Sequence, residues 1–250
     1  MEMLKVDGLC KKYPEFELKN ISFTVESGHI MGFVGRNGAG KSTTIKAMLN
    51  IIHADSGYVE LLGKNVAENE TECKKNLGVV YGGIDFYPKK KLSAIRNTYK
   101  DFYAEKWNEE KYNQYIKLFE IDDSKTADQL SSGMKIKFMI ALALSHDAKL
   151  FIFDEPTSGL DPVSRDDICN LFKSLVKSGK RAIFFSTHII SDIENCATHI
   201  TYIHKGEIAE SMPVNSMLEK YSNLKKDGKP TLEEIIVSLE RKKYDDKIFD

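Results

Sequence analysis

The sequence predicts an α/β fold with a mostly parallel sheet, a small antiparallel β subdomain and an inserted α-helical subdomain. Three observations support this prediction. A glycine-rich loop at residues 35–43 lies between a short apolar run and a segment with helical spacing. A second apolar run, residues 150–153, ends in the carboxylates Asp154 and Glu155. From there to residue 185, strand-like and helix-like segments alternate, which is typical of a parallel sheet.

Strand-like segments flank the glycine-rich loop. Residues 4–9 begin a strand pattern, residues 21–25 alternate apolar with polar side chains, and residues 57–62 form another short strand pattern. We expect these segments to form a small antiparallel layer wrapped over the loop. Tyr13 lies in the turn between the first two segments, and its ring offers a face on which adenine can stack. Taken alone, an ordinary loop tyrosine is the simpler interpretation.

The glycine-rich loop fits the phosphate-loop pattern G-x-x-x-x-G-K-[ST] at every fixed position. Glycine permits backbone conformations in which successive N–H groups converge on a phosphate. Lys41 is placed to reach the β- and γ-phosphates, Ser42 to ligate Mg²⁺, and residues 43–52 to form a helix that begins at the phosphates. We therefore expect a P-loop NTPase core. Its candidate nucleotide-binding residues are Gly35, Asn37, Gly38, Ala39, Gly40, Lys41, Ser42 and Thr43.

Polar side chains follow two of the predicted core strands. An acid at the end of a strand that faces a phosphate loop can hold Mg²⁺, so Asp154 is a candidate metal ligand. Glu155 is then placed to act as a general base on the attacking water. His188 follows the apolar run at residues 182–185, where it can bond to a γ-phosphate. The alternatives are two acids that cap a helix and a structural histidine.

The middle of the chain has helical spacing from residue 88 to about residue 144. Within it, residues 130–134 read Leu-Ser-Ser-Gly-Met and precede an apolar helical segment. Ser131 and the N–H groups near Gly133 would lie at a helix N-terminus, which favours anions. A subdomain at this position is not expected to fold back onto its own phosphate loop. We therefore expect this second anion site to act on the nucleotide of a partner chain.

These patterns divide the chain into three parts. The ATPase core with its β subdomain comprises residues 1–84 and 150–211, and the inserted helical subdomain comprises residues 85–149. Residues 212–250 form an amphipathic helical tail. A capping box at residues 231–234 begins the helix of that tail.

The composition limits the classes of function. With 36 Lys and Arg against 37 Asp and Glu, the net charge is −1, which provides no basic field for nucleic acid. The four cysteines lack paired C-x-x-C spacing, so we expect reduced thiols. No signal region follows Met1, and no apolar run approaches the roughly 20 residues that span a bilayer. We expect any membrane role to come through a partner.

In order and spacing, the motifs resemble those of the nucleotide-binding subunits of ATP-binding cassette (ABC) transporters. The resemblance covers roughly residues 3–211. The matching segments are residues 35–43 (Walker A), 130–134 (the LSGGQ signature, with departures at Ser132 and Met134), 150–155 (Walker B) and 158–161 (the D-loop).

The resemblance implies a role for individual positions. Glu155 stands at the catalytic glutamate, His188 at the switch histidine, and Lys41 at the Walker A lysine that takes part in catalysis. Tyr13 falls where the family has its adenine-stacking aromatic, which favours base stacking over the simpler interpretation. The implied cofactors are ATP and Mg²⁺, and the implied reaction converts ATP and water to ADP and phosphate.

The resemblance also implies partners. A homodimer or heterodimer would hold two ATP molecules between Walker A of one chain and Ser131 and Gly133 of the other. A separate transmembrane permease would hold this dimer at the cytoplasmic, inner face of the cell membrane. Within the family, the chain most resembles the exporter-type (ABC-2-like) subfamily, whose members export peptides, antibiotics or lipid-like molecules. The features that carry this resemblance are residues 43–46, residues 159–162 and the short helical block.

One departure from the family concerns the glutamine that contacts Mg²⁺ and the attacking water. Gly82 and Gly83 occupy the candidate positions, and the nearest oxygen ligand is Asp85. We hypothesise that Asp85 substitutes for the glutamine as a metal ligand. The alternative is that the contact is absent and turnover is slow. An ABC ATPase without a transport role and a degenerate nucleotide-binding module remain open as alternative functions.

Overall fold

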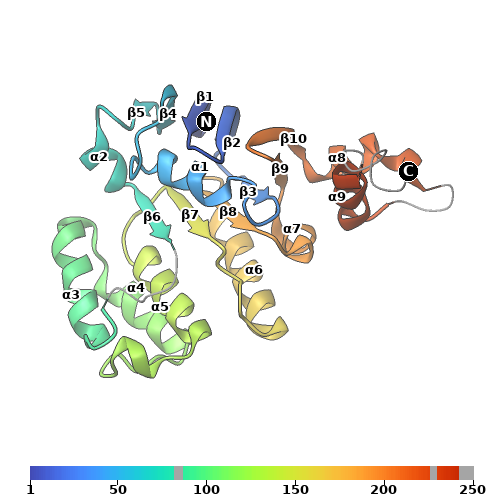
Figure 1. Cartoon of the computed structure of the whole chain (residues 1–250). Coiled ribbons are helices and arrows are strands. Elements are labelled where there is room, and N and C mark those ends of the chain that lie inside the picture. Colours follow the sequence, from blue (N-terminus) through green and yellow to red (C-terminus); the bar gives the residue numbers. More distant parts are fainter. Residues whose placement is uncertain (82–86, 226–229, 242–250) are drawn as a thin grey trace.

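The computed structural model describes residues 1–81, 87–225 and 230–241. Within this part of the chain the main sheet has the strand order β10-β9-β3-β8-β7-β6 (Figure 1). Strands β9, β3, β8, β7 and β6 run parallel, and β10 is antiparallel to β9. The mostly parallel sheet is therefore confirmed. The strands are β3 (Ile30–Val34), β6 (Leu77–Val80), β7 (Leu150–Asp154), β8 (Ala182–Thr187), β9 (His199–His204) and β10 (Glu207–Pro213).

A second sheet covers the upper part of the molecule in Figure 1 and has the order β2-β1-β4-β5. The pairs are antiparallel, so the predicted β layer over the phosphate loop is confirmed. Its strands are β1 (Glu2–Lys12), β2 (Glu17–Glu26), β4 (Ser56–Leu61) and β5 (Lys64–Asn65).

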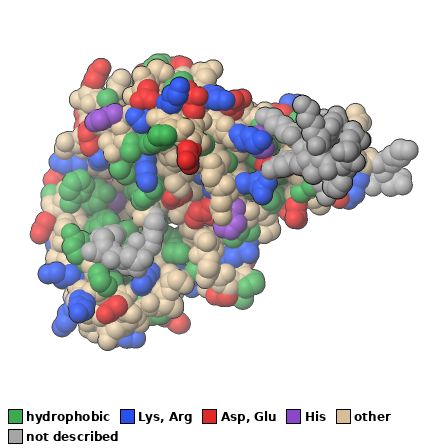
Figure 2. All heavy atoms as spheres, in the orientation of Figure 1, with side chains coloured by type: hydrophobic (Ala, Val, Ile, Leu, Met, Phe, Trp, Pro, Cys, Tyr) green, Lys and Arg blue, Asp and Glu red, His purple; other side chains and the backbone are tan. Residues whose placement is uncertain are grey.

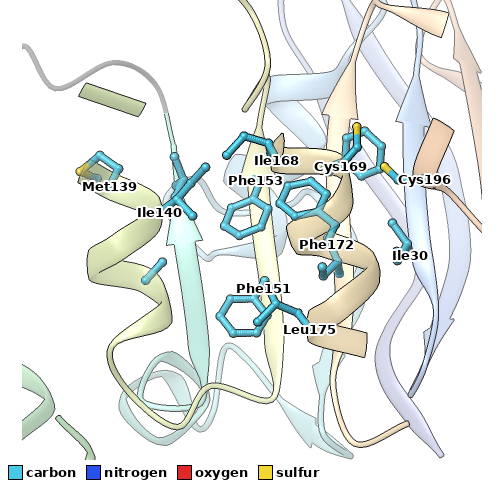
Figure 3. Close-up of a cluster of buried hydrophobic side chains, with 14 of the residues drawn as sticks. Ile30, Met139, Ile140, Phe151, Phe153, Ile168, Cys169, Phe172, Leu175 and Cys196 are labelled. Carbon is cyan, nitrogen blue, oxygen red and sulfur yellow. The ribbon is translucent and has the colours of Figure 1, made fainter. Parts of the chain in front are cut away.

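Alternate residues of the central strands enter two separate hydrophobic clusters, because successive side chains of a strand point to opposite faces. In β3, Ile30 and Val34 join a cluster shared with α5, α6, α7 and α9, whereas Met31 and Phe33 join a cluster shared with α1, β1 and β2. Figure 3 shows part of the first cluster. There the ring of Phe172 on α6 is stacked on that of Phe153 on β7, with the ring centroids 5.0 Å apart.

Helix α1 (Lys41–Met48) begins directly at the phosphate loop, two residues earlier than the spacing predicted. It also ends earlier than the predicted residue 52. Leu49 lies outside the helical region, and Asn50 has a φ of 53°, a left-handed conformation that stops the helix. The expected helix is therefore correct in type and wrong in its bounds.

The helical block contains α3 (Leu92–Tyr103), α4 (Glu109–Leu118) and α5 (Ser132–Leu144), at the lower left of Figure 1. In α5, the residues from Phe138 onward are buried and pack near β6. The buried residues of the block and of one face of the sheet consequently form one continuous cluster. The division of the chain into core, helical subdomain and tail stays a prediction.

The C-terminal elements follow the predicted signals. Asp161 accepts hydrogen bonds from the N–H groups of Val163 and Ser164 and so caps α6 (Pro162–Val176). Lys205 and Gly206, with φ of 48° and 78°, form the two-residue turn between β9 and β10.

The remaining helices are α2 (Glu70–Lys74), α7 (Ile190–Cys196), α8 (Val214–Lys220) and α9 (Leu232–Arg241), with short 3₁₀ turns at Ala104–Lys106, Ala127–Gln129 and Ser222–Leu224.

The tail helix α9 packs on the core. Thr231 and Glu234 exchange the two hydrogen bonds of a capping box, as predicted. Leu232 and Ile235 are fully buried in the cluster that also contains α7. Among the described residues, none of the helices is both long and apolar enough to cross a membrane.

Candidate nucleotide-binding site

The phosphate loop connects the C-terminal end of β3 to the N-terminus of α1. Gly40 has a φ of 114°, and a Cβ atom there would lie 2.6 Å from Leu18, so this position requires glycine. Gly38 has a φ of 82°, and a Cβ there would have no atom within 4 Å. The loop is therefore packed on one side against β2 and open on the other.

Lys41 is almost fully buried at the first position of α1. Its ammonium group donates to the carbonyl oxygen of Gly35 over 2.8 Å, which holds the side chain across the loop. The ammonium also lies 3.3 Å from Oε1 of Glu155. A buried cation with a partly accessible carboxylate as its ion-pair partner is suited to exchange that carboxylate for a phosphate.

A hydrogen-bonded series of polar groups joins the loop to the ends of β7 and β8. The Ser42 hydroxyl donates to Oδ2 of Asp154 over 3.2 Å, and the Ser186 hydroxyl donates to Oδ1 over 2.5 Å. The same Ser186 oxygen accepts the backbone N–H of Glu155 over 3.0 Å. A hydroxyl and a carboxylate in this arrangement form a set of hard oxygen donors that fits Mg²⁺.

Glu155 stands just beyond β7 with a φ of 53°, a left-handed conformation that costs a non-glycine residue about 1–2 kcal/mol. This turn aims its carboxylate back over the phosphate loop. Nδ1 of His188, just beyond β8, lies 2.7 Å from Oε2 of Glu155 and donates to it in the tautomer that carries a proton there. The histidine side chain is 46% exposed, so it stands at the rim of the site.

The order of the strands explains why these residues meet. Strands β3, β8 and β7 are parallel neighbours, so their carboxyl ends share one edge of the sheet. Each delivers one part of the site at that edge: the phosphate loop, His188, and the two acids. The structure thus brings together the predicted Lys41, Ser42, Asp154, Glu155 and His188.

A cleft of about 660 Å³ lies over the loop. Phe16, directly before β2, lines it, whereas Tyr13 does not. The Tyr13 ring lies 5.9 Å from the ammonium of Lys11 instead, and its side chain is exposed. Gly35 and Ala39 are also absent from the lining, since Gly35 approaches β9 closely and Ala39 is buried. The lining residues are Glu15, Phe16, Arg36, Asn37, Gly38, Gly40, Lys41, Ser42, Thr43, Glu155, Ser158 and His188.

The residues of the predicted second anion site lie elsewhere. Ser131 caps α5 by accepting the N–H of Met134 over 3.2 Å. A Cβ at Gly133 would lie 2.9 Å from Leu160, so this helix end stands against the segment that follows the two acids. Neither Ser131 nor Gly133 lines the cleft over the phosphate loop. The predicted metal ligand Asp85 lies outside the described residues.

Helix α9 contacts the phosphate loop through a polar cluster at the end of β9. The hydroxyl of Tyr202 donates to Glu240, Nδ1 of His204 lies 2.9 Å from the same oxygen, and Arg36 of the loop lies 3.8 Å from the other oxygen. Burial alone would raise the pKa of Glu240, but the hydrogen bonds from Tyr202 and His204 outweigh it and hold the pKa below its ordinary value. No local sequence pattern predicts this contact.

Phe16 and Ser186 are two further residues at the site that the sequence patterns did not predict. An aromatic residue near the start of a strand was a usable signal for Phe16, but Tyr13 carried the same signal. The role of Ser186 depends on its register opposite Asp154 across β7 and β8, for which the sequence has no marker.

The sequence is similar to those of known proteins. The family model described as ABC transporter matches residues 18–158. The bacitracin transport ATP-binding protein BcrA of Bacillus licheniformis is 35% identical over 237 residues, which cover 92% of this chain and 74% of BcrA.

Two solved structures share the fold. The ATP-binding subunit of an ABC transporter superposes with a TM-score of 0.84 at 24% identity, over 95% of this chain and 99% of that one. A dimeric bacterial ABC transporter cassette gives a TM-score of 0.75 at 22% identity, over 85% of this chain and 99% of that one. With the family model and the relative, the fold leads to one conclusion: the chain belongs to the ABC transporter family, as one of its ATP-binding, ATP-hydrolysing subunits.

Proposed function

We propose that the chain uses ATP hydrolysis to power the export of a peptide, antibiotic or lipid-like substrate through a separate transmembrane permease. The observation that carries the proposal is the meeting of three functional groups at one sheet edge: Lys41, the Ser42–Asp154 pair, and the Glu155–His188 pair. The similarity to a protein named for bacitracin transport supports the substrate class.

The residues of the site divide the work between binding and chemistry. The amides of the phosphate loop and Lys41 bind the β- and γ-phosphates, and the positive end of α1 adds to their attraction. Ser42 and Asp154 would hold Mg²⁺, which would neutralise phosphate charge when bound. The γ-phosphate replaces Glu155 as the partner of Lys41, and the released carboxylate accepts a proton from the attacking water. His188 orients that carboxylate.

For the base of ATP, the cleft favours Phe16 over Tyr13. Phe16 lines the cleft, whereas the ring of Tyr13 lies at Lys11. A Cβ on Gly40 would lie 2.9 Å from the Phe16 ring, so this ring is adjacent to the loop itself. Base stacking on aromatic rings tolerates either residue type. Loss of nucleotide affinity in Phe16→Ala, but not in Tyr13→Ala, is the expected result.

A second copy of the chain, or a related subunit, completes the site. Ser131 and Gly133 lie away from the chain's own cleft, beside Leu160, and present a helix N-terminus capped by Ser131. In a head-to-tail dimer they would face the γ-phosphate held by the other chain. Hydrolysis would remove that charge and open the dimer. The permease would place this dimer at the cytoplasmic face of the membrane.

The role of Asp85 as an additional metal ligand remains part of the proposal, because no glutamine stands near Gly82 and Gly83. If Asp85→Ala hydrolyses ATP at the parental rate with the same Mg²⁺ dependence, Asp85 has no such role. A slow or degenerate module is the competing function. It would bind ATP and show slow or no steady-state turnover, in spite of intact Lys41 and Glu155.

The central experiment measures nucleotide affinity and permease association together. Lys41→Ala should lose ATP affinity by about 100-fold or more, since a buried charge-assisted contact to phosphate is removed. Binding within a few-fold of the parent would contradict the proposed site. If the chain copurifies with a polytopic membrane protein, the result supports transport. If no membrane protein copurifies with it in repeated preparations, the result supports an ABC ATPase without a transport role.

A further inference from the structure

We infer that Ser186 is a positioning residue that sets the geometry of both acids at the end of β7. Ser186 is the fifth residue of β8 and is completely buried. It stands directly opposite Asp154 in the parallel pair of β7 and β8. The inference rests on the proposed function, because it assigns Ser186 a part in binding Mg²⁺ and in activating water.

One hydroxyl group serves both acids. As a donor, the Ser186 hydroxyl bonds to Oδ1 of Asp154 over 2.5 Å, which turns the other oxygen, Oδ2, toward Ser42 at 3.2 Å. As an acceptor, it receives the backbone N–H of Glu155 over 3.0 Å. A hydroxyl has one proton and two lone pairs, so it can fill both roles at once.

The hydrogen bond from the N–H of Glu155 to the Ser186 hydroxyl stabilises an unfavourable backbone conformation at Glu155. Glu155 has a φ of 53°, and its N–H also lies 3.2 Å from the backbone carbonyl oxygen of Ser186. A left-handed glutamate persists only where its surroundings hold it. With this conformation held, the Glu155 carboxylate reaches Lys41 on one side and His188 on the other. Ser186 acts through these acids and is not one of the residues that line the cleft.

The bond to Asp154 orients that carboxylate. One of its oxygens accepts from Ser186 and the other from Ser42, and these two contacts define how the carboxylate is turned. A carboxylate with one oxygen turned toward Ser42 is placed to join that hydroxyl as a ligand of Mg²⁺. Without Ser186, Asp154 would lose its orienting donor and Glu155 the side-chain acceptor of its N–H.

The test compares Ser186→Ala with the parent and with Ser145→Ala. Ser145 is also fully buried, but its hydroxyl donates to the carbonyl oxygen of Ala141 at the end of α5, away from the site. In Ser186→Ala, kcat for ATP should fall about 10- to 100-fold, the effect of one lost hydrogen bond to a charged group. Ser145→Ala should keep the parental kcat.

A second readout does not depend on turnover. The affinity for a non-hydrolysable ATP analogue is measured by calorimetry with and without Mg²⁺. In Ser186→Ala the gain in affinity on adding Mg²⁺ should shrink, while the affinity without Mg²⁺ stays parental. Ser186→Thr, which restores the hydroxyl, should recover both kcat and the Mg²⁺ response. If Ser186→Ala does not fold, Ser186→Cys, which keeps the volume and donates weakly, takes its place.

The outcomes separate the two hypotheses. If the parent hydrolyses ATP and Ser186→Ala matches it in kcat and Mg²⁺ response, the positioning role of Ser186 is wrong. An equal loss of affinity with and without Mg²⁺ would show a purely structural role and would also overturn the inference. If the parent itself shows neither ATP binding nor turnover, the proposed function fails instead.

Discussion

Nδ1 of His188 lies 2.7 Å from Oε2 of Glu155, although 33 positions separate the two residues in the chain. The other oxygen of the same carboxylate lies 3.3 Å from the ammonium of Lys41. Glu155 is thus held between a buried cation and an imidazole at the rim of the cleft. Several properties of the protein should depend on this carboxylate and on the elements around it.

Glu155→Gln should bind ATP with parental affinity and lose turnover. The amide keeps the size of the side chain but cannot accept a proton, and general-base catalysis contributes about 100- to 10,000-fold. Steady-state phosphate release and nucleotide calorimetry measure the two effects separately. The variant should also accumulate an ATP-dependent dimer on a sizing column. Parental phosphate release would remove Glu155 from the role of base.

Gly206→Ala should destabilise the fold more than Gly63→Ala. Both glycines have a left-handed backbone, with φ of 78° and 76°. A Cβ at Gly206 would lie 1.9 Å from the carbonyl oxygen of Glu17, whereas nothing lies within 4 Å of one at Gly63. We expect a loss of about 2–4 kcal/mol for Gly206→Ala and about 1 kcal/mol for Gly63→Ala. Urea denaturation measures both, and equal losses would contradict the close contact.

Arg165→Ala should destabilise the protein through the carboxylate it leaves behind. Asp192 is buried, with Arg165 Nη2 at 2.5 Å from one oxygen and Thr157 Oγ1 at 2.5 Å from the other. Removing the cation from a buried pair costs about 3 kcal/mol or more. The matched control is Lys19→Ala, which breaks a half-exposed pair with Glu207 and should cost less than about 1 kcal/mol. Similar losses in both variants would show that Asp192 is adequately hydrated.

Stability should fall as the pH is lowered below about 6.5. Burial lowers the pKa of His146, whose Nε2 donates to the carbonyl oxygen of Leu77 over 2.8 Å. The unfolded chain therefore binds a proton at a pH where the folded chain does not, and this difference favours unfolding as the pH falls from the unfolded toward the folded pKa. His29 and His199, stacked 3.8 Å apart, act in the same direction because burial lowers both pKa values.

Urea midpoints between about pH 7.5 and about pH 5.5 test this dependence. His146→Gln keeps an N–H donor but does not titrate, so its midpoint should fall less steeply with pH than that of the parent. A parental slope in this variant would assign the acid sensitivity to other groups.

Most of the site was predictable because its residues follow directly from strand ends. The phosphate loop after Val34 and the acids after Phe153 stand where an apolar run stops, and His188 follows the apolar run at residues 182–185 after two polar residues. Parallel strands bring such positions to one edge. The alternation of strand-like and helix-like segments predicted the parallel sheet, and the strand-like segments that flank the phosphate loop predicted the antiparallel sheet.

The features that the sequence did not predict depend on contacts between segments that are distant in the chain or on the local backbone conformation. Which aromatic ring faces the cleft is decided in the turn after β1, where the N–H of Tyr13 bonds to the carbonyl oxygen of Phe16 over 2.7 Å. Helix α1 ends early because of the backbone of Asn50. The contact of Glu240 with Arg36 joins segments about 200 positions apart, and no local pattern records it.

Strand β3, which carries the phosphate loop, is anchored by alternate side chains in two hydrophobic cores, one on each face of the sheet. A slide of this strand by one residue would exchange the two sets of side chains and disrupt both cores. The strand therefore holds the start of the phosphate loop at one position relative to the sheet. We expect the displacement that accompanies nucleotide binding to fall on the parts that close against it, such as the helical block, rather than on the loop itself.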